Sequence, residues 1–368
     1  MRTNLATNAR YSSIKAPRPI RPIRPIMLRC ALLALTSVII RVAKPEFLRL
    51  GSKLDLSSNQ LTTIYWYLKW ALPLWAIVDL NSGLNRWAER RWIWKTDKSA
   101  WDWKHEIAVV TGGSAGIGAY VVKRLASHGI RVAVLDVNPL SDVFNKEELA
   151  LVQFYQCDIT SRESIHQAAE TIRSDLGPPS ILINNAGIGN AWTILDIPEE
   201  NLKRMLDINL MSHWSTVQEF LPDMLAKKKG HIMSVASLAS FVALANAVDY
   251  SCTKAALLAF HEGLTQELKH RYKCPQIQTS IVHPNWTKSA ITSHSSIQTG
   301  LRSVGAKILE PEHVAQAMVD QIIAVKSGQL ILGPAMAPKF RALPLWLQEI
   351  VRDSQANIVS GNGSTAGG

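Results

Sequence analysis

A tyrosine and a lysine stand four residues apart in the segment Tyr-Ser-Cys-Thr-Lys, at Tyr250 and Lys254. The segment begins a helical stretch that runs to about His270, so both side chains are expected on one helix face. A phenol with a pKa of about 10 is a weak base at neutral pH, and a neighbouring ammonium group favours the phenolate. The pair can therefore exchange a proton with a bound hydroxyl or carbonyl group, although a core tyrosine beside a solvated lysine gives the same pattern.

Other polar residues come directly after predicted buried strands. Ser237 lies just past the strand His231–Val235, and the segment Asn-Asn-Ala-Gly, which includes Asn185, Ala186 and Gly187, closes the strand at 181–183. The carboxyl ends of parallel strands meet at one edge of a sheet and line one crevice there. We therefore expect these residues to converge with Tyr250 on a single site.

The strands needed for this arrangement are short β-branched runs that alternate with helix-length segments. This alternation predicts an α/β fold, a Rossmann-type, doubly wound parallel sheet of about seven strands. The expected strands are 107–110, 130–135, 152–155, 181–183, 231–235, 277–282 and 330–332, with helices that include 119–128, 165–176 and 198–221.

A glycine-rich segment follows the first predicted strand and begins the first helix. Glycines at such a turn let the backbone approach a pyrophosphate, whose charge then faces the helix N-terminus. Asp136 lies 18 residues beyond Gly118, at the end of the second strand. A carboxylate there binds an adenosine ribose and repels a 2′-phosphate, which favours NAD over NADP unless nearby basic residues override it. The expected cofactor contacts in the turn are Thr111, Gly112, Ser114, Gly116, Ile117 and Gly118.

The order and spacing of these motifs over residues 106–334 resemble the short-chain dehydrogenase/reductase family. The resemblance implies that Tyr250 is the catalytic acid or base and that Lys254 lowers its pKa and holds the nicotinamide ribose. It further implies that Ser237 hydrogen-bonds the substrate oxygen. Asn209 matches the asparagine that positions a water linked to Lys254, which completes a catalytic tetrad.

The same resemblance implies further cofactor contacts. Asp158 matches the residue that bounds the adenine pocket, and Asn185 belongs to the motif that lines the cofactor site. Pro284 is followed by Asn285 where most members have glycine, and Thr287 falls where a backbone usually holds the nicotinamide carboxamide. Backbone contacts tolerate that exchange, so Pro284 and Thr287 remain expected contacts.

The Pro-Asn dipeptide, the segment Leu309-Glu310-Pro311-Glu312 and the plan of the N-terminal region are similar to one branch of the family. This branch comprises the membrane-associated retinol dehydrogenases and 17-beta-hydroxysteroid dehydrogenases of the endoplasmic reticulum and lipid droplets. The similarity implies a lipophilic substrate, such as a retinoid, a steroid or a long-chain alcohol or ketone. It also implies a possible homodimer through the helix that carries Tyr250 and the helix before it.

The charge of the chain is unevenly distributed. Lysine and arginine number 40 against 29 acidic residues, a net charge of +11, but residues 1–105 hold 18 basic and 6 acidic residues whereas 106–368 hold 22 and 23. A near-neutral second part argues against a nucleic-acid partner. The four cysteines lack metal-ligand spacing, and no histidine pairing suggests a metal site.

The N-terminal part has the composition of a membrane attachment. Residues 1–45 contain no acid, 30–40 and 61–80 are apolar runs, and eight of the twelve tryptophans lie between 66 and 103, interleaved with arginine and lysine after residue 85. Such a belt favours a membrane surface, while a mitochondrial transit peptide and tryptophans packed on the globular domain are the alternatives. We expect a basic, Pro-rich leader (1–25), a membrane-associated segment (26–104), the dehydrogenase domain (105–335), an apolar extension (336–359) and a disordered tail (360–368).

Two other functions remain open at this point. An NADPH-dependent carbonyl reductase requires a basic residue near the 2′-phosphate, and the turn 137–139 offers none. A non-catalytic NAD-binding membrane scaffold would be favoured by loss of a tetrad residue, and all four are present. The sequence therefore predicts a membrane-associated enzyme that interconverts a hydroxyl and a carbonyl group.

Overall fold

The computed structural model describes residues 45, 57–89, 91–93, 97–293, 295–303 and 305–359. The chain divides into two compact units, residues 1–88 and 89–368. The expected leader, the apolar run at 30–40, Trp94 and the tail after residue 359 lie outside the described residues.

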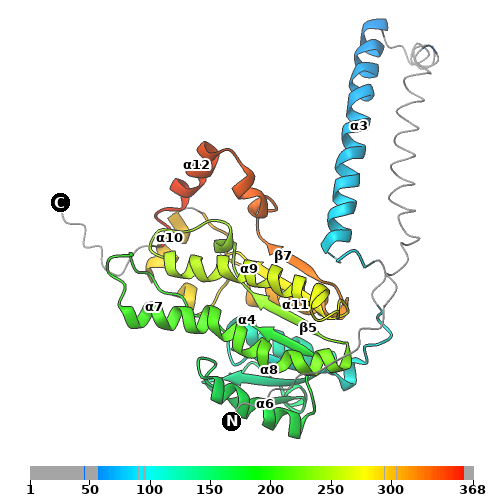
Figure 1. Ribbon diagram of the computed structural model, residues 1–368. Coiled ribbons are helices and arrows are strands. Elements are labelled where there is room, and N and C mark those ends of the chain that lie inside the picture. Colours follow the sequence, from blue (N-terminus) through cyan, green and yellow to red (C-terminus); the bar gives the residue numbers. More distant parts are fainter. Residues whose placement is uncertain are drawn as a thin grey trace, which may run out of the picture. The chain divides into compact units, whose positions relative to one another are not determined.

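The second unit is built on one seven-stranded parallel sheet with the order β3-β2-β1-β4-β5-β6-β7, which confirms the predicted fold class (Figure 1). Parallel register places Val109 of β1 between Ala133 of β2 and Leu182 of β4. All seven predicted strands are present. They span Ile107–Thr111 (β1), Arg131–Asp136 (β2), Val152–Gln156 (β3), Ile181–Asn184 (β4), His231–Val235 (β5), Gln278–Pro284 (β6) and Gly328–Leu332 (β7).

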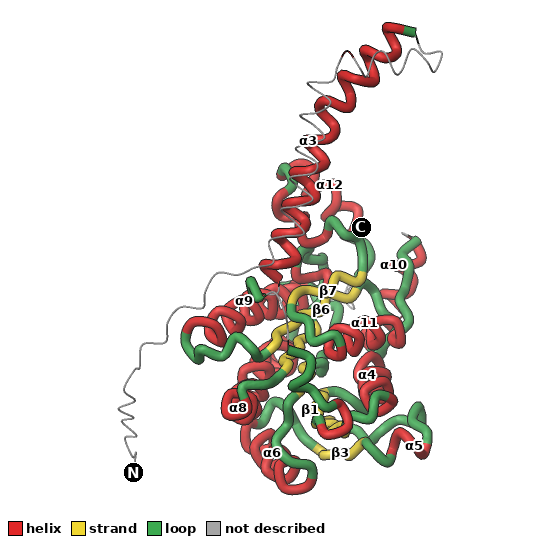
Figure 2. The backbone as a smooth tube through the Cα atoms, turned by 90° about the vertical axis from the view of Figure 1, so that its right-hand side faces the viewer, coloured by secondary structure: helices red, strands yellow, loops and turns green. Residues whose placement is uncertain are grey.

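Helices cover both faces of this sheet, as the near-continuous burial of its central strands requires. On one face α4 (Gly116–Ser127) and α11 (Pro311–Ile323) pack against Ala108 and Val110 of β1. On the other face α6 (Arg162–Asp175), α8 (Ser212–Lys227) and α9 (Val248–His270) pack against Val109. Figure 2 shows α8 and α9 on one side of the strands and α4 and α11 on the other. A short α5 (Lys146–Leu149) precedes β3.

The single helix predicted at 198–221 is instead three segments. The helix α7 (Glu199–Leu206) continues into a π-helical turn, Asp207–Met211, before α8 begins. Short π-helical turns are energetically unfavourable and often occur at functional sites. Here the turn carries Asn209, so the departure from regular helix lies at a predicted catalytic residue.

The C-terminal part continues beyond the last strand. After β6 the chain forms α10 (Ser295–Ser303), α11 and β7, then a short 3-10 turn, Ala337–Ala342, and α12 (Leu345–Gln355). Figure 1 shows the 3-10 turn and α12 in orange and red, on the α9 and α10 side of the fold.

The described part of the first unit is dominated by α3 (Ser58–Glu89), which has 32 residues and contains Pro73. In the ranges that the structure describes, no helix is long and apolar enough to cross a membrane. Many large apolar side chains of α3 are nevertheless exposed. They include Trp66, Tyr67, Trp70, Leu74, Trp75, Ile77 and Val78.

Part of the predicted tryptophan and arginine belt belongs to the globular unit. Trp101 is buried and stacks on Trp103 with ring centroids 5.1 Å apart. Arg91 is also buried, and its guanidinium donates to Ser327 Oγ at 2.7 Å and to Gln278 Oε1 at 3.2 Å. These three residues therefore follow the alternative in which the belt packs on the globular domain, and a membrane attachment elsewhere in 26–104 stays a prediction.

Candidate active site

Tyr250 lies in the first turn of α9 and faces the strand edge that carries Ser237. Its neighbour Lys254 is buried, with 3% of its surface exposed, and its Nζ lies 5.4 Å from the Tyr250 ring centroid. The Lys254 ammonium donates to the carbonyl of Val235 at 3.0 Å. Ser237 follows β5 in extended backbone and makes a side-chain hydrogen bond with Tyr250. The three residues thus form one contiguous polar group at the carboxyl end of the sheet.

The protein environment affects these groups in opposite directions. Burial raises the pKa of Tyr250 above its ordinary value, and the hydrogen bond with Ser237 acts against this increase. Burial lowers the pKa of Lys254 to about 8, since a charged ammonium loses hydration there. The lysine remains mainly cationic at pH 7, and its charge lies 5.4 Å from the Tyr250 ring centroid.

Asn209 is fully buried and uses its side chain to hold a neighbouring loop. Its Oδ1 accepts from the backbone N–H of Ile188 and its Nδ2 donates to the Ile188 carbonyl, both at 2.8 Å. A Cβ placed on Gly187 would lie 3.4 Å from Asn209 Oδ1 and 3.6 Å from Lys254 Nζ. The three residues therefore meet, and the side chain of Asn209 positions the loop 187–189 beside the lysine.

The glycine-rich turn between β1 and α4 needs glycine for two reasons. Gly112 has a φ of +63°, and a Cβ there would lie 2.8 Å from Ala186 Cα. A Cβ on Gly118 would lie 2.0 Å from the carbonyl oxygen of Gly112, so the helix can pass the turn only without a side chain. This close packing leaves the N-terminus of α4, with its unpaired N–H groups, open to the cavity.

Asn185 and Thr111 fix this turn to the end of β4. The Asn185 amide donates to the carbonyls of Thr111 at 3.1 Å and Gly112 at 2.9 Å. In return, Thr111 Oγ1 accepts from the backbone N–H groups of Asn185 and Ala186, each at 3.1 Å. The two predicted motifs are therefore one hydrogen-bonded unit.

Asp136 ends β2 and faces the same turn. Its carboxylate accepts from the backbone N–H of Ser114 and of Asn138, both at 3.0 Å. The hydroxyl of Ser114 donates to the Asn138 carbonyl at 2.8 Å, which fixes the two loops together. Asp136 is thus held at the rim of the cavity, in the position that the sequence predicts for a ribose contact.

The remaining predicted contacts also line this cavity. Asp158 borders it with a carboxylate that accepts from the backbone and hydroxyl of Thr160, at 2.9 and 2.8 Å. Thr287 is buried and lies beside Leu309, because Leu309 donates to the carbonyl of Trp286 at 2.8 Å. Further lining residues of the predicted set are Gly112, Gly116, Ile117, Asn185, Ala186, Gly187, Ser237, Tyr250, Lys254 and Pro284.

The cavity has a volume of about 1280 Å³ and is continuous from Asp136, past Tyr250, to the C-terminal part of the chain. Pockets for one small ligand usually measure about 300–1,000 Å³. Every lining residue from Pro284 onward is uncharged, so the C-terminal segments give the cavity an uncharged wall. The charged lining residues come from other segments. They are Asp136, Asp158, Glu200, Lys203, Arg204, Asp207 and Lys254.

Comparisons with known proteins agree with this arrangement. The family model for the short chain dehydrogenases matches residues 106–299. The chain belongs to the short-chain dehydrogenase family. It is therefore an oxidoreductase that acts on CH–OH groups and uses NAD or NADP.

Several proteins of this family are similar over most of their length. Dehydrogenase RED2 of Cochliobolus heterostrophus is 43% identical over 51% of this chain and 70% of its own. Epidermal retinol dehydrogenase 2 of Mus musculus is 29% identical over 67% of this chain and 78% of its own. Estradiol 17-beta-dehydrogenase 11 of Pongo abelii is 28% identical over 59% and 72%. The resemblance to the retinol and hydroxysteroid branch is thereby confirmed.

A solved structure shows the same fold. A short-chain dehydrogenase from Novosphingobium aromaticivorans superposes with a TM-score of 0.55 and 26% sequence identity, over 68% of this chain and 87% of that chain. The turn that excludes a Cβ at Gly118 and the open helix N-terminus fit the dinucleotide that the family binds.

For the apolar end of this dehydrogenase cavity, the sequence predicts only an apolar extension at 336–359. The structure shows which of its residues line the cavity, among them Phe340, Val351, Gln355 and Val359. Ile291 and Ile297 also line this end. No motif marks such positions, because their role arises from packing between distant segments.

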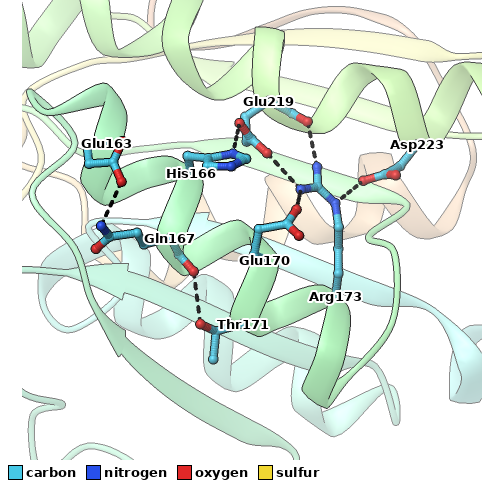
Figure 3. A network of polar contacts seen from close by, with 8 residues as sticks. All are labelled: Glu163, His166, Gln167, Glu170, Thr171, Arg173, Glu219 and Asp223. Carbon is cyan, nitrogen blue, oxygen red and sulfur yellow. Dashed lines mark hydrogen bonds and ion pairs between the residues drawn. The ribbon is translucent and has the colours of Figure 1, made fainter.

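A second group of ionisable residues lies on α6 and α8, away from this site. Among the described residues, His166, Glu170 and Glu219 are the one set placed closely enough to hold a metal ion. Figure 3 shows the Arg173 guanidinium between three carboxylates, with contacts to Glu170 at 2.6 Å, Glu219 at 2.7 Å and Asp223 at 2.9 Å. The arginine already supplies the positive charge, so we read the group as an ion-pair network that joins α6 to α8.

Proposed function

We propose that this dehydrogenase interconverts a secondary or primary hydroxyl group and the corresponding carbonyl group on a lipophilic, uncharged substrate. The observation that carries the proposal is the uncharged wall that residues 284–359 contribute to the cavity. Placing a charged ligand there would cost its hydration without any opposite charge to compensate. Similarity to proteins named for retinol and estradiol supports the same class.

Each residue of the site has a separate role in the reaction. When bound, the nicotinamide accepts or supplies the hydride. Tyr250 takes the hydroxyl proton during oxidation and returns it during reduction, while Ser237 holds the substrate oxygen. Lys254 keeps a positive charge next to the tyrosine, and Asn209 keeps the loop 187–189 in place beside that charge.

We further propose that NAD is the preferred cofactor. Asp136 is held by two backbone N–H groups at the cavity rim, where its charge would repel a 2′-phosphate. The alternative, an NADPH-dependent carbonyl reductase, would need a cation near Asp136, and the adjoining turn 137–139 contains none. A non-catalytic scaffold is disfavoured because Asn209, Ser237, Tyr250 and Lys254 converge.

The enzyme is proposed to work at a membrane, with the endoplasmic reticulum or lipid droplets as the location and mitochondria as the alternative. The exposed tryptophan, leucine and isoleucine side chains of α3 support a lipid surface as their partner. Washing membranes with alkaline carbonate tests the attachment: full-length protein should stay with the pellet. Release into the supernatant would contradict an inserted segment.

A homodimer through α8 and α9 is the proposed assembly. Trp214 and Phe260 pack with ring centroids 4.4 Å apart, and Trp214 and Met211 are exposed. Aromatic and methionine side chains on a helix pair are typical of interface centres. Sedimentation of the detergent-solubilised chain, compared with Trp214→Asp, tests this assembly.

The reaction itself is tested by following NADH formation with purified protein and NAD. We expect turnover with retinol, estradiol or 1-dodecanol and much lower kcat/KM for glycerol and for the anion 3-hydroxybutyrate, which are polar or charged. A higher kcat/KM for either of the latter two would contradict a lipophilic substrate.

A further inference from the structure

Ser237 lies where the backbone pairing between β5 and β6 is interrupted. The N–H of Ala236 still donates to the carbonyl of Val282, at 2.8 Å. In a continuing parallel ladder the N–H of residue 284 would next donate to the carbonyl of Ala236. Residue 284 is proline, which has no N–H. The backbone of Ser237 therefore needs a partner other than the next ladder bond to fix its position.

A side chain of β6 supplies this partner. His283, the residue before Pro284, has its Nδ1 3.0 Å from the backbone carbonyl oxygen of Ser237. A carbonyl oxygen can only accept, so the ring carries its proton on Nδ1 and donates it. His283 is buried, and its ring packs on Phe241 with ring centroids 4.6 Å apart. The ring is thus held by packing as well as by the hydrogen bond.

The surroundings of His283 keep the ring neutral. Its Nε2 is buried and has no hydrogen-bond partner among the described residues, so a second proton would be left without an acceptor. Burial lowers the pKa of His283 to about 4, and the Lys254 ammonium acts in the same direction, whereas the bond to Ser237 opposes the decrease. His261 of α9, itself buried, also faces His283. At neutral pH the ring therefore keeps one donor, and it points at Ser237.

The chain on either side of Ser237 is tied to α9 through Lys254. Before the serine, Lys254 Nζ donates to the carbonyl of Val235 at 3.0 Å. After it, Ser240 Oγ donates to the backbone carbonyl of Lys254 at 2.8 Å. Between these two contacts, His283 bonds the backbone of the serine itself from the opposite element, β6. The position of Ser237 thus depends on both α9 and β6.

We propose that His283 is a positioning residue for the reaction: its ring N–H holds the backbone carbonyl of Ser237 and so keeps the serine hydroxyl beside Tyr250 and the substrate oxygen. This inference rests on the proposed roles of Tyr250 and Ser237. His283 is not among the described residues that line the cavity, so it acts through Ser237.

Two substitutions separate the hydrogen bond from the packing of the ring. His283→Leu removes the donor and keeps an apolar side chain, whereas His283→Asn keeps an amide N–H near the position of Nδ1. His231→Leu is the matched control. His231 is also buried, with its Nε2 2.9 Å from Ser280 Oγ and its Nδ1 without a partner among the described residues. It lies at the start of β5, at the end of the strand opposite to Ser237.

Two measurements do not depend on turnover. Nitrogen NMR of the His283 ring in the unchanged protein should show a proton on Nδ1 and none on Nε2 at neutral pH. Hydrogen exchange in residues 236–241 should be about tenfold faster in His283→Leu than in the unchanged protein, and little changed in His283→Asn and His231→Leu. The affinity for NADH should stay within about twofold in all three variants, since the glycine-rich turn is not altered.

Kinetics with NAD and 1-dodecanol then test the effect on the reaction. In His283→Leu, kcat should fall about tenfold, and His283→Asn should restore most of it. The Ser237 hydrogen bond lowers the pKa of Tyr250, so its weakening should also move the pH of half-maximal oxidation upward. A residue that only stabilises the fold would not produce this shift, and His231→Leu should not show it.

The outcomes are distinct. If His283→Leu and His231→Leu have the same kcat and the same pH profile, or if the His283 proton is on Nε2, the proposal is wrong. If no form oxidises any alcohol while the NMR and exchange results are as expected, the proposed reaction fails and the placement of Ser237 by His283 stands.

Discussion

The two ends of the cavity are built in different ways. The dinucleotide end consists of short segments that directly follow β1, β2 and β4, joined by hydrogen bonds from Asn185, Thr111 and Asp136. The apolar end consists of segments between residues 284 and 359, joined by side-chain packing and by a few contacts such as Asn246 to Val359. Tyr250 stands where the two ends meet.

The dinucleotide end has the features that members of the family share, whereas the apolar end can differ from one enzyme to another. Hydrogen bonds between fixed backbone groups leave little freedom in residue type, so the dinucleotide end needs glycine, asparagine and aspartate at set positions. An apolar wall tolerates many side chains of similar volume. Residues of the apolar end can therefore differ between enzymes that share the same reacting groups.

The largest expected effect is on the group between the two ends. Tyr250→Phe removes the proton-transferring hydroxyl and keeps the ring, so kcat should fall by about 10²–10⁴-fold. Binding of NADH should remain within about twofold, since the glycine-rich turn and Asp136 lose no contact. Stopped assays of NADH formation and fluorescence titration with NADH provide the two readings.

Tyr272→Phe is the matched control for this substitution. Tyr272 is an exposed residue after α9, and its hydroxyl contacts Glu267 at 3.4 Å. Its loss should leave kcat unchanged. Comparable activity of Tyr250→Phe and the unchanged protein would remove Tyr250 from the mechanism.

The next effect is confined to the dinucleotide end. In Gly118→Ala the new Cβ would lie 2.0 Å from the Gly112 carbonyl oxygen, so the turn must move and NADH affinity should fall at least about tenfold. Gly263→Ala in α9 is the control, because no atom lies within 4 Å of its new Cβ. The control should keep NADH affinity and gain about 0.5–1 kcal/mol in unfolding free energy.

Binding of dodecanol to Gly118→Ala should separate the two ends further. If the ends are independent, calorimetry with the isolated protein should give the same dodecanol affinity as the unchanged chain. A parallel loss of NADH and dodecanol affinity would show that the two ends form one cooperative unit.

The sequence is sufficient to predict that the motif residues of the dinucleotide end lie around one cavity, while their contacts with a cofactor stay predictions. Each strand that ends there carries its functional residue at the carboxyl end, so local pattern and sheet topology suffice to place Asn185, Asp136 and Ser237 together. The π-helical turn at Asn209 was not predicted. One extra residue in a helix shifts the spacing of its apolar residues too little to be recognised in the sequence. The raised pKa of Tyr250 depends on burial, which spacing does not reveal.

The apolar end could be predicted only in outline. Nothing in the sequence indicates that Val359 meets Asn246, since 113 residues separate them. Arg91 shows the same limit: an arginine in a basic, tryptophan-rich segment looks solvated, yet it is buried against Ser327 and Gln278. Such contacts follow from the final packing of the chain and not from local preference.

A smaller effect concerns cofactor choice at the dinucleotide end. Asp136→Ala removes the negative charge and also the acceptor for Ser114 and Asn138. The ratio of kcat/KM for NAD to that for NADP should fall about tenfold, mainly through better use of NADP. Asp142→Ala, in the same connection between β2 and β3, is the control and should leave the ratio unchanged. An unaltered ratio in Asp136→Ala would show that the carboxylate does not select against the 2′-phosphate.

The half of the fold that contains β5, β6, α8 and α9 should be more sensitive to acid than the half that contains β1–β3. The buried histidines with lowered pKa values lie on β5, β6, α8 and α9. Tyr250 is also on α9, and Ser237 follows β5. Burial lowers the pKa of His261 and His283 from 6.5 to about 4, and that of His213 and His231 to about 3. The described histidines near β1–β3, His105, His128 and His166, are exposed.

The sign follows from proton uptake. Below pH 6.5 each of these histidines binds a proton in the unfolded chain, whereas in the folded chain it stays neutral down to about pH 4. The unfolding free energy is therefore highest above pH 6.5 and decreases as the pH falls. Each histidine should contribute about 1.4 kcal/mol of lost unfolding free energy per pH unit in this window. Urea unfolding between pH 7 and 4.5 should show a slope that decreases by this amount in His261→Gln and not in His128→Gln. As the pH is lowered from 7 to 5, protection from hydrogen exchange should therefore be lost first in α8 and α9 and last in α4. If α4 loses protection first, the two halves do not differ in the way that their histidines indicate.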